Sequence, residues 1–360
     1  MRALYRKLKA FFEARIEQRL TPSGFAFTFL ILLVGLAAFL SANNLLFLLL
    51  AALMATLLIS GFINRLSLSG LELEFLLPEH LSARRRSTAR LIVRNRKRLL
   101  PSFSIHLAGT GANGLSQTVY WPMLPGGRST EELVEVYFEH RGRYRDNGFQ
   151  FTSRFPFGFA ERRVSVTLRG DALVYPCVDP QPGFEQLLVD INGELEAQFR
   201  GRGHDFYRIR PYEYLESARH VDWKATAHTG ELQVREFARE QEMLLEIFLD
   251  LDVAPALENW LERAIDCSAY LALHLIERGA RMRMRTQGVD IAAPEQGDVY
   301  TILRYLAVVV PLPGKPSLAP DEENAFQVVF TAQPQRARNA GWARARIVGP
   351  DELVAPQRPD

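Results

Sequence analysis

The chain has 360 residues, 48% of them hydrophobic and 23% charged, and its formal net charge is +2 at pH 7. A balance this close to neutral provides no global field that would call for nucleic acid as a partner. The two cysteines, Cys177 and Cys267, belong to no Cys-x-x-Cys motif and no Cys/His cluster. We therefore predict two free, buried thiols, with no disulfide and no cysteine-bound metal.

Residues 1–20 form a basic amphipathic segment with six basic and two acidic side chains. Its apolar residues recur at helical spacing, which is typical of a helix lying on an anionic membrane surface. A solvated or disordered tail is an equally good interpretation. The apolar residues of this pattern are Leu4, Leu8, Phe11, Phe12 and Ile16.

Residues 21–64 carry no charged side chain. Two apolar runs, Ser23–Leu40 and Leu45–Ile63, are separated only by residues 41–44. At ~1.5 Å per residue each run can cross a hydrocarbon core of ~30 Å. Because the link is too short to cross back, we predict an antiparallel transmembrane hairpin. A cleaved signal peptide fits poorly because a second apolar run follows at once, and charge-free runs of this length are rare in soluble domains.

Basic residues flank the hairpin on both sides. Residues 80–100 hold eight of them and no acid, and the turn at 41–44 is neutral. An excess of Lys and Arg marks the cytoplasmic side of a membrane segment. We therefore expect a two-pass protein of the cytoplasmic (inner) membrane, with both termini in the cytoplasm.

Residues 66–176 show short alternating segments separated by turn signals, which favours an antiparallel β-sandwich. The basic cluster Arg84–Arg98 could bind anionic lipid or nucleic acid, or could form the outer face of an edge strand. No aromatic residues interleave it for base stacking, so we expect no nucleic acid. The expected strands include Leu71–Phe75, Arg90–Arg94, Glu132–Phe138, Gly148–Phe155 and Arg163–Leu168.

Residues 177–243 form a poorly periodic connecting segment, and residues 244–335 change to an α/β pattern. Strand, helix, strand, helix and strand follow one another there, as in an open α/β sheet. We expect residues 336–360 to be a C-terminal tail. The five elements are expected at Leu244–Asp250, Leu257–Ile276, Arg281–Thr286, Val299–Val310 and Ala325–Thr331.

Arginines, carboxylates and aromatics interleave between Arg208 and Phe237. Guanidinium groups pair bidentately with carboxylates and stack on aromatic rings. The segment is either a structural clasp between domains, with Trp223 largely buried, or a docking surface for a partner. The residues proposed for this motif are Arg210, Tyr212, Glu216, Arg219, Asp222, Trp223, Lys224, Arg235 and Glu236.

This segment resembles the pattern R-x-Y-x-x-G-D-x-x-R-x-I-x-W-x-x-x-A-R, followed by G-x-L-x-V-x-E-F, of the bacterial family known as domain of unknown function 58. Leu215, Glu216 and His228 depart from it. His140–Tyr144 and Arg154–Gly158 resemble two further elements of that family. The resemblance implies a membrane-anchored protein with a β-sandwich and a von Willebrand factor A-like domain, encoded beside a MoxR-type AAA+ ATPase.

Asp250 and Asp252 follow the first strand of the α/β region. In von Willebrand factor A domains a D-x-S-x-S motif holds a divalent cation at this place, and a hard cation needs several oxygen ligands. Ala254 stands where the second serine would be. We therefore expect a degenerate site, with Mg²⁺ as a possible ion and no dedicated cofactor.

Motifs of P-loop nucleotide hydrolases, zinc proteases and serine hydrolases are absent from the sequence. We therefore expect a multi-domain protein that is not an enzyme: a membrane-anchored cytoplasmic binding platform. Its expected partners are a MoxR-type AAA+ ATPase, by resemblance, and anionic lipid at the membrane surface. The alternative is a divalent-metal-dependent ligand-binding module or enzyme that uses Asp250 and Asp252.

Overall fold

The structure is a computed structural model with two compact units, Met1–Tyr175 and Pro176–Asp360. Each unit is described by itself. The described residues are 5–10, 15–41, 43–180, 189–191, 193, 206–212, 221–237, 244–277, 279–294, 297–315, 319–320 and 325–353.

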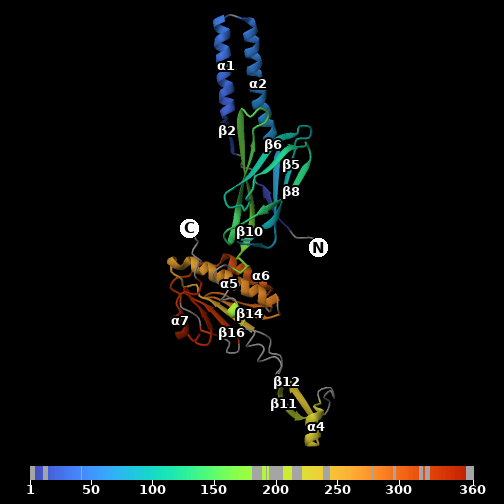
Figure 1. Ribbon diagram of the computed structural model, residues 1–360, viewed down its shortest axis with the longest axis vertical. Coiled ribbons are helices and arrows are strands. Elements are labelled where there is room, and N and C mark those ends of the chain that lie inside the picture. The colour runs from blue at the N-terminus through green and yellow to red at the C-terminus, as the bar shows by residue number, and fades with distance from the viewer. Residues whose placement is uncertain are drawn as a thin grey trace. The chain divides into compact units, whose positions relative to one another are not determined.

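Two long apolar helices, α1 (Pro22–Ser41) and α2 (Asn44–Leu68), lie side by side in the first unit (Figure 1). Asn43 caps α2 by accepting a hydrogen bond from the backbone N–H of Leu45 at 2.9 Å. Both helices are long and apolar enough to cross a membrane. They leave large apolar side chains such as Phe25 and Leu58 more than 70% exposed, which a soluble core helix would not do.

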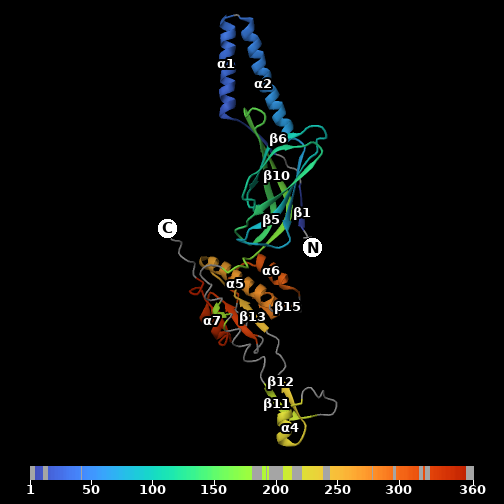
Figure 2. The same cartoon turned by 45° about the vertical axis from the view of Figure 1, so that its right-hand side comes forward.

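The strands of the first unit join into one mainly antiparallel sheet, in the order β7-β6-β9-β10-β1-β3-β5-β8. Two further strands, β2 and β4, pair with β10. The strands are visible below the helices α1 and α2 in Figure 2. Their bounds are β1 (Tyr5–Ala10), β2 (Arg15–Leu20), β3 (Leu71–Pro78), β4 (Leu81–Ser82), β5 (Ser87–Asn95), β6 (Ser102–Thr110), β7 (Val119–Leu124), β8 (Ser129–Val136), β9 (Gly142–Ser153) and β10 (Ala160–Tyr175).

One apolar core serves this whole sheet. Strand β3 buries every second residue, as period-2 side-chain alternation requires. The rings of Phe75 on β3 and Phe149 on β9 meet edge to face, with centroids 5.1 Å apart. Because β3 and β9 are not neighbours in the sheet, this contact shows that its two parts face each other across the core.

Two of the interpretations offered for this unit are wrong. The described residues of the N-terminal segment do not form an interfacial helix: β1 pairs with β3 and β10, and β2 pairs with β10 from Ala160 to Ser165. The apolar residues of this segment recur at helical spacing, but β3 and β10 have edges with unpaired backbone groups. Hydrogen bonding to those edges favours strands over a helix. The cluster Arg84–Arg98 does not lie on an edge strand either, because β5 has β3 on one side and β8 on the other.

The second unit contains a five-stranded sheet in the order β15-β14-β13-β16-β17, parallel except for β15 at one edge. Helices α5 and α6 lie together on one side of it (Figure 1). The α/β pattern predicted from Leu244 onward is therefore present. The bounds are β13 (Leu244–Leu249), η2 (Pro255–Leu257), α5 (Glu258–Glu277), β14 (Arg281–Arg285), β15 (Asp290–Ala293), α6 (Val299–Val308), β16 (Phe326–Phe330), α7 (Pro334–Asn339) and β17 (Arg346–Val348).

The expected C-terminal tail is wrong in part, because the α/β fold continues beyond residue 335. Strand β17 pairs with β16, and the side chain of Trp342 is fully buried. Its ring stacks on Phe248 of β13 with centroids 5.2 Å apart. The three residues of β17 are too few to show a period, which is why the sequence pattern ended early.

Candidate functional site

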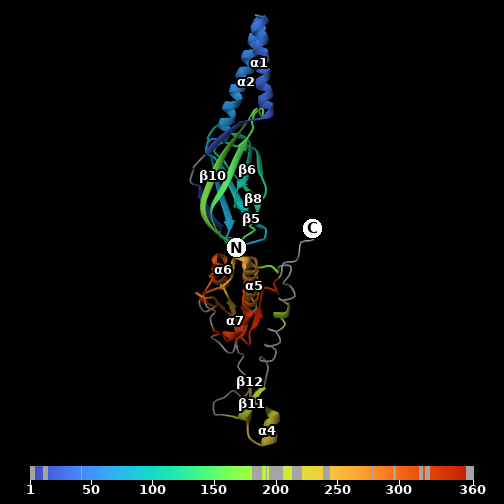
Figure 3. The same cartoon turned by 90° about the vertical axis from the view of Figure 1, so that its left-hand side faces the viewer.

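The motif between Arg208 and Phe237 belongs to a small two-stranded sheet with one helix, visible in Figure 3. In chain order its elements are β11 (Phe206–Pro211), α4 (Trp223–Thr229) and β12 (Gln233–Phe237). The Asp222 carboxylate caps α4 by accepting from the backbone N–H groups of Lys224 and Ala225 at 3.0 and 3.2 Å. Gly230 ends the helix in the left-handed conformation, with φ of 76°. Asp222 and Gly230 therefore stabilise the two ends of α4.

Trp223 is 68% exposed, whereas the clasp interpretation expects it to be largely buried. It occupies the first turn of α4, and its neighbour Lys224 is exposed as well. Leu232, which precedes β12, is 45% exposed. Exposed tryptophan is common at protein-binding surfaces, where aromatic residues are enriched.

The other residues of the predicted motif are only partly accounted for. Tyr212 is half-buried, and its backbone N–H donates to the carbonyl of Leu232 at 2.8 Å. Glu216 and Arg219 lie outside the described residues. Arg210 pairs with Val234 across the two strands, and Arg235 and Glu236 lie on β12. The ion-pair network proposed for this segment stays a prediction.

A second polar cluster lies at the carboxyl end of β13. Both Asp250 and Asp252 are buried. Asp250 accepts hydrogen bonds from the side-chain amide of Gln287, from the Thr331 hydroxyl at 2.7 Å, and from the backbone N–H of Asp252 at 3.1 Å. Asp250 is thus held by protein donors from three separate segments of the chain.

Asp252 is held differently, because a cation of the protein faces it. Its carboxylate accepts from the backbone N–H of Gly314 at 2.6 Å and forms an ion pair with Arg336 of α7. The Gly314 hydrogen bond and the adjacent Arg336 guanidinium hold the pKa of Asp252 below its usual value of 3.8, although burial opposes them. The guanidinium therefore supplies the positive charge that a bound cation would bring.

These contacts bear on the metal hypothesis. The side chain of Ala254 offers no ligand atom, and the oxygens of Asp250 and Asp252 are engaged by donors that a metal would have to displace. Among the described residues no group of three His, Cys, Asp or Glu side chains is arranged to hold a metal ion. The donor set does not fit a dedicated Mg²⁺ site, which needs near-octahedral oxygen ligation.

The sequence pattern missed the residues that complete this cluster. Gln287, Thr331 and Arg336 follow β14, β16 and the start of α7, so only the sheet brings them to Asp250 and Asp252. It also missed a buried ion pair within the sheet, where the Arg285 guanidinium donates to Glu246 at 2.7 Å. The only local signal was the basic residue itself, which carries no information about its partner.

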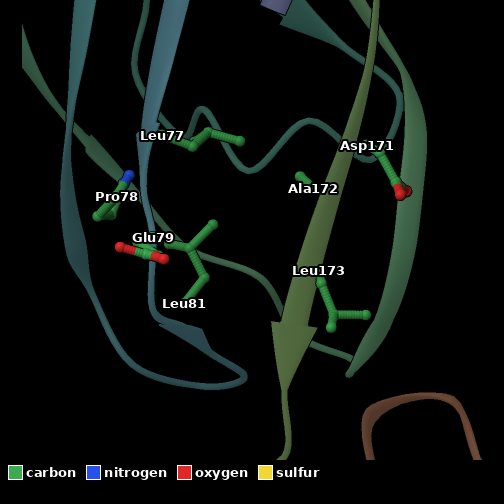
Figure 4. A pocket seen from close by; sticks show the side chains of 7 residues that line it. All are labelled: Leu77, Pro78, Glu79, Leu81, Asp171, Ala172 and Leu173. Carbon is green, nitrogen blue, oxygen red and sulfur yellow. The ribbon is translucent and has the colours of Figure 1, made fainter. Parts of the chain in front are cut away.

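A pocket in the first unit is too small to be a ligand site. It lies between the β3–β4 segment and the Asp171–Leu173 part of β10 (Figure 4). Its volume of about 10 Å³ is room for about one water. Leu77, Leu81 and Leu173 are among the residues that line it, and its lining is mainly apolar.

The second unit thus defines an α/β protein module with a carboxylate–arginine cluster at its strand ends and an exposed tryptophan motif. Residues 208–340 match the model of a family described as "Protein of unknown function DUF58". The match includes the tryptophan motif, Asp250, Asp252 and Arg336. No curated protein matches the chain.

Proposed function

We propose that this chain is a membrane-anchored, non-enzymatic binding platform that works with a MoxR-type AAA+ ATPase in assembling or remodelling protein complexes. The observation that carries the proposal is the combination of two lipid-compatible helices with a polar cluster whose carboxylates are already engaged by hydrogen-bond donors and an arginine of the protein. A cluster satisfied in this way is suited to presenting a fixed surface rather than to activating a substrate.

The finer fold assignments belong to the same proposal. The antiparallel sheet of the first unit is interpreted as a β-sandwich, supported by the Phe75–Phe149 contact across its core. The α/β sheet of the second unit is interpreted as a degenerate von Willebrand factor A-like domain, supported by Asp250 and Asp252 at the end of β13. A protein partner would then be recognised without the metal ion that the intact motif supplies.

The proposed topology places both termini, the β-sheet of the first unit and the second unit in the cytoplasm. Its support is the excess of basic residues on the two flanks of the hairpin, at residues 1–20 and 80–100. Reporter fusions at residue 20 and after residue 70 should both report a cytoplasmic location. A periplasmic report from the second fusion alone would exclude the hairpin.

The docking surface is proposed to include Trp223, Lys224 and Leu232, three exposed residues of the motif. The experiment is purification of the tagged chain in mild detergent, followed by identification of the proteins bound to it. A MoxR-type AAA+ ATPase should be retained by the wild type and lost from Trp223→Ala. Retention of the same proteins by both would remove this surface from the proposal.

A further inference from the structure

One turn of the β-sheet holds both apolar helices. It runs from Arg154 to Ala160 and joins β9 to β10. The Thr21 hydroxyl, just before α1, donates to the carbonyl of Phe159 at 3.0 Å, and the Ser23 hydroxyl donates to that of Gly158 at 2.9 Å. Aromatic stacking of Phe27 on Phe159, with centroids 4.2 Å apart, extends the contact.

The second helix reaches the same turn. Asn64, 3% exposed, donates from its amide to the carbonyl of Ala160 at 2.7 Å. The two helices are therefore fixed at one level relative to the turn, through Thr21 and Ser23 on one side and Asn64 on the other. The turn therefore lies at the same depth in a bilayer as these helix ends.

Helix length sets that depth. With 20 residues, α1 is about 30 Å long, and the part of α2 from Asn44 to Asn64 is about as long. The hydrocarbon core is also ~30 Å thick, so each helix needs its whole length up to the turn to cross it. The turn therefore lies at the hydrocarbon edge.

The side chains around the turn suit that position. Phe157 is 55% exposed, and Phe25 and Phe29 on α1 are 71% and 59% exposed. These rings carry no polar group that would need water. Just outside the apolar zone, Arg65 follows Asn64, and Arg162 lies two residues beyond Ala160.

Arg65 and Arg162 form a like-charge pair. The Arg162 guanidinium donates to the side-chain oxygen of Gln18 at 2.6 Å, a neutral partner. Burial and the nearby charge of Arg65 lower the pKa of Arg162. Among the described residues no ion pair joins either guanidinium to a carboxylate, so an anion between them would relieve their repulsion.

We propose that the turn Arg154–Ala160 is a membrane-inserting element that seats Phe157 at the edge of the hydrocarbon, with Arg65 and Arg162 beside it binding the phosphate of an anionic lipid. The inference rests on the proposed membrane anchoring and extends it: the β-sheet unit is docked on the bilayer surface, not suspended below it. Its orientation relative to the membrane is then fixed.

Depth measurement tests the turn. Both native cysteines are buried, so a nitroxide label can be directed to Phe157→Cys in the full chain, reconstituted in vesicles of phosphatidylcholine and phosphatidylglycerol. Phe29→Cys is the matched position within a span, and Leu133→Cys, at a residue 67% exposed on β8, is the matched position in the sheet. The label at 157 should be relaxed by oxygen and shielded from a water-soluble nickel complex, as at 29.

The control separates two failures. A label at 29 that is open to the nickel complex would contradict membrane anchoring itself. A label at 29 in lipid with one at 157 in water, as at 133, would contradict only the inserted turn.

Lipid binding tests the arginine pair. Phosphatidylglycerol titrated into the full chain in neutral detergent should raise its melting temperature. Arg162→Gln should weaken that binding about fivefold, the effect expected for one basic residue near an anionic surface. The control is Arg86→Gln, an exposed arginine ion-paired to Glu135, which should leave the binding unchanged. Equal binding by all three proteins, or an equal loss in both variants, would overturn the phosphate site.

Discussion

Gly24 lies so close to Phe159 that a Cβ atom on the glycine would come within 1.9 Å of the Phe159 carbonyl oxygen. No side chain fits there without moving the backbone of the β9–β10 turn away from α1. The absence of a Cβ is thus what lets the first helix meet the sheet. The contact makes the helix pair and the sheet one structural unit.

Gly24→Ala should therefore destabilise the chain in detergent by about 1–3 kcal/mol, because overpacking at this site must be relieved by a backbone shift. Gly61→Ala is the matched control, since a Cβ at Gly61 meets no atom within 4 Å. That variant should be neutral or slightly stabilising, as replacement of a helical glycine usually is. Thermal unfolding of the two variants decides the point, and equal melting temperatures would show that the helix does not dock as described.

The ion pair of Asp252 with Arg336 predicts a pH-dependent stability. Because folding depresses the pKa of Asp252 below 3.8, its ionised form stabilises the folded state at neutral pH, and that contribution is lost as the pH falls through the lowered pKa. Asp252→Asn should cost about 1–3 kcal/mol near pH 7 by removing charged hydrogen bonds.

The difference between wild type and Asp252→Asn should shrink as the pH falls below about 4. Chemical unfolding of the detergent-solubilised chain at several pH values measures it. Asp351→Asn, at an exposed position, controls for the loss of one negative charge. A difference that stays constant down to pH 3 would show that the Asp252 carboxylate does not carry the effect.

The same ion pair predicts weak dependence on metal. Titration calorimetry of Mg²⁺ or Mn²⁺ into the solubilised chain should show no binding in the micromolar range, because Arg336 already pairs with Asp252 and hydrogen-bond donors already occupy the oxygens of Asp250. Micromolar affinity that Asp250→Ala abolishes would favour the metal-dependent alternative instead.

Replacement by alanine should change the free energy of unfolding little at one tryptophan and greatly at another. Trp223 is 68% exposed, so Trp223→Ala should change the free energy of unfolding by less than about 0.5 kcal/mol. Trp342 is fully buried and stacks on Phe248, so Trp342→Ala should cost about 3–5 kcal/mol. Thermal unfolding in detergent compares them. A large loss at Trp223 would restore the clasp interpretation of the motif.

The sequence predicted those elements that have a hydrophobic period or a long charge-free run. The two apolar helices, the alternating strands around Leu73 and Val93, and the α/β pattern from Leu244 are all present. It did not predict strands β1 and β2, whose pairing depends on edges formed by distant segments. Backbone pairing of that kind leaves little trace in the side-chain pattern.

The residues of the candidate site also divide into those that the sequence predicted and those that it missed. Asp250 and Asp252 could be found because both follow a buried strand. Asp222 was assigned to an ion-pair motif, and its role as the cap of α4 was not predicted because the segment showed no helical period. Arg336 could not, because it acts across 84 residues of sequence. The sequence left the exposure of Trp223 open, because a mixture of charged and aromatic residues suits a buried clasp and an open surface equally well.

Direct binding to the proposed partner tests the central claim. The full chain in lipid nanodiscs is titrated with a purified MoxR-type AAA+ ATPase from the same genome, and the dissociation constant is compared between wild type and Trp223→Ala. The account predicts saturable binding by the wild type and at least about tenfold weaker binding by the variant, the loss expected when an exposed aromatic anchor is removed. No saturable binding by the folded wild-type chain, or equal binding by the two proteins, would contradict it.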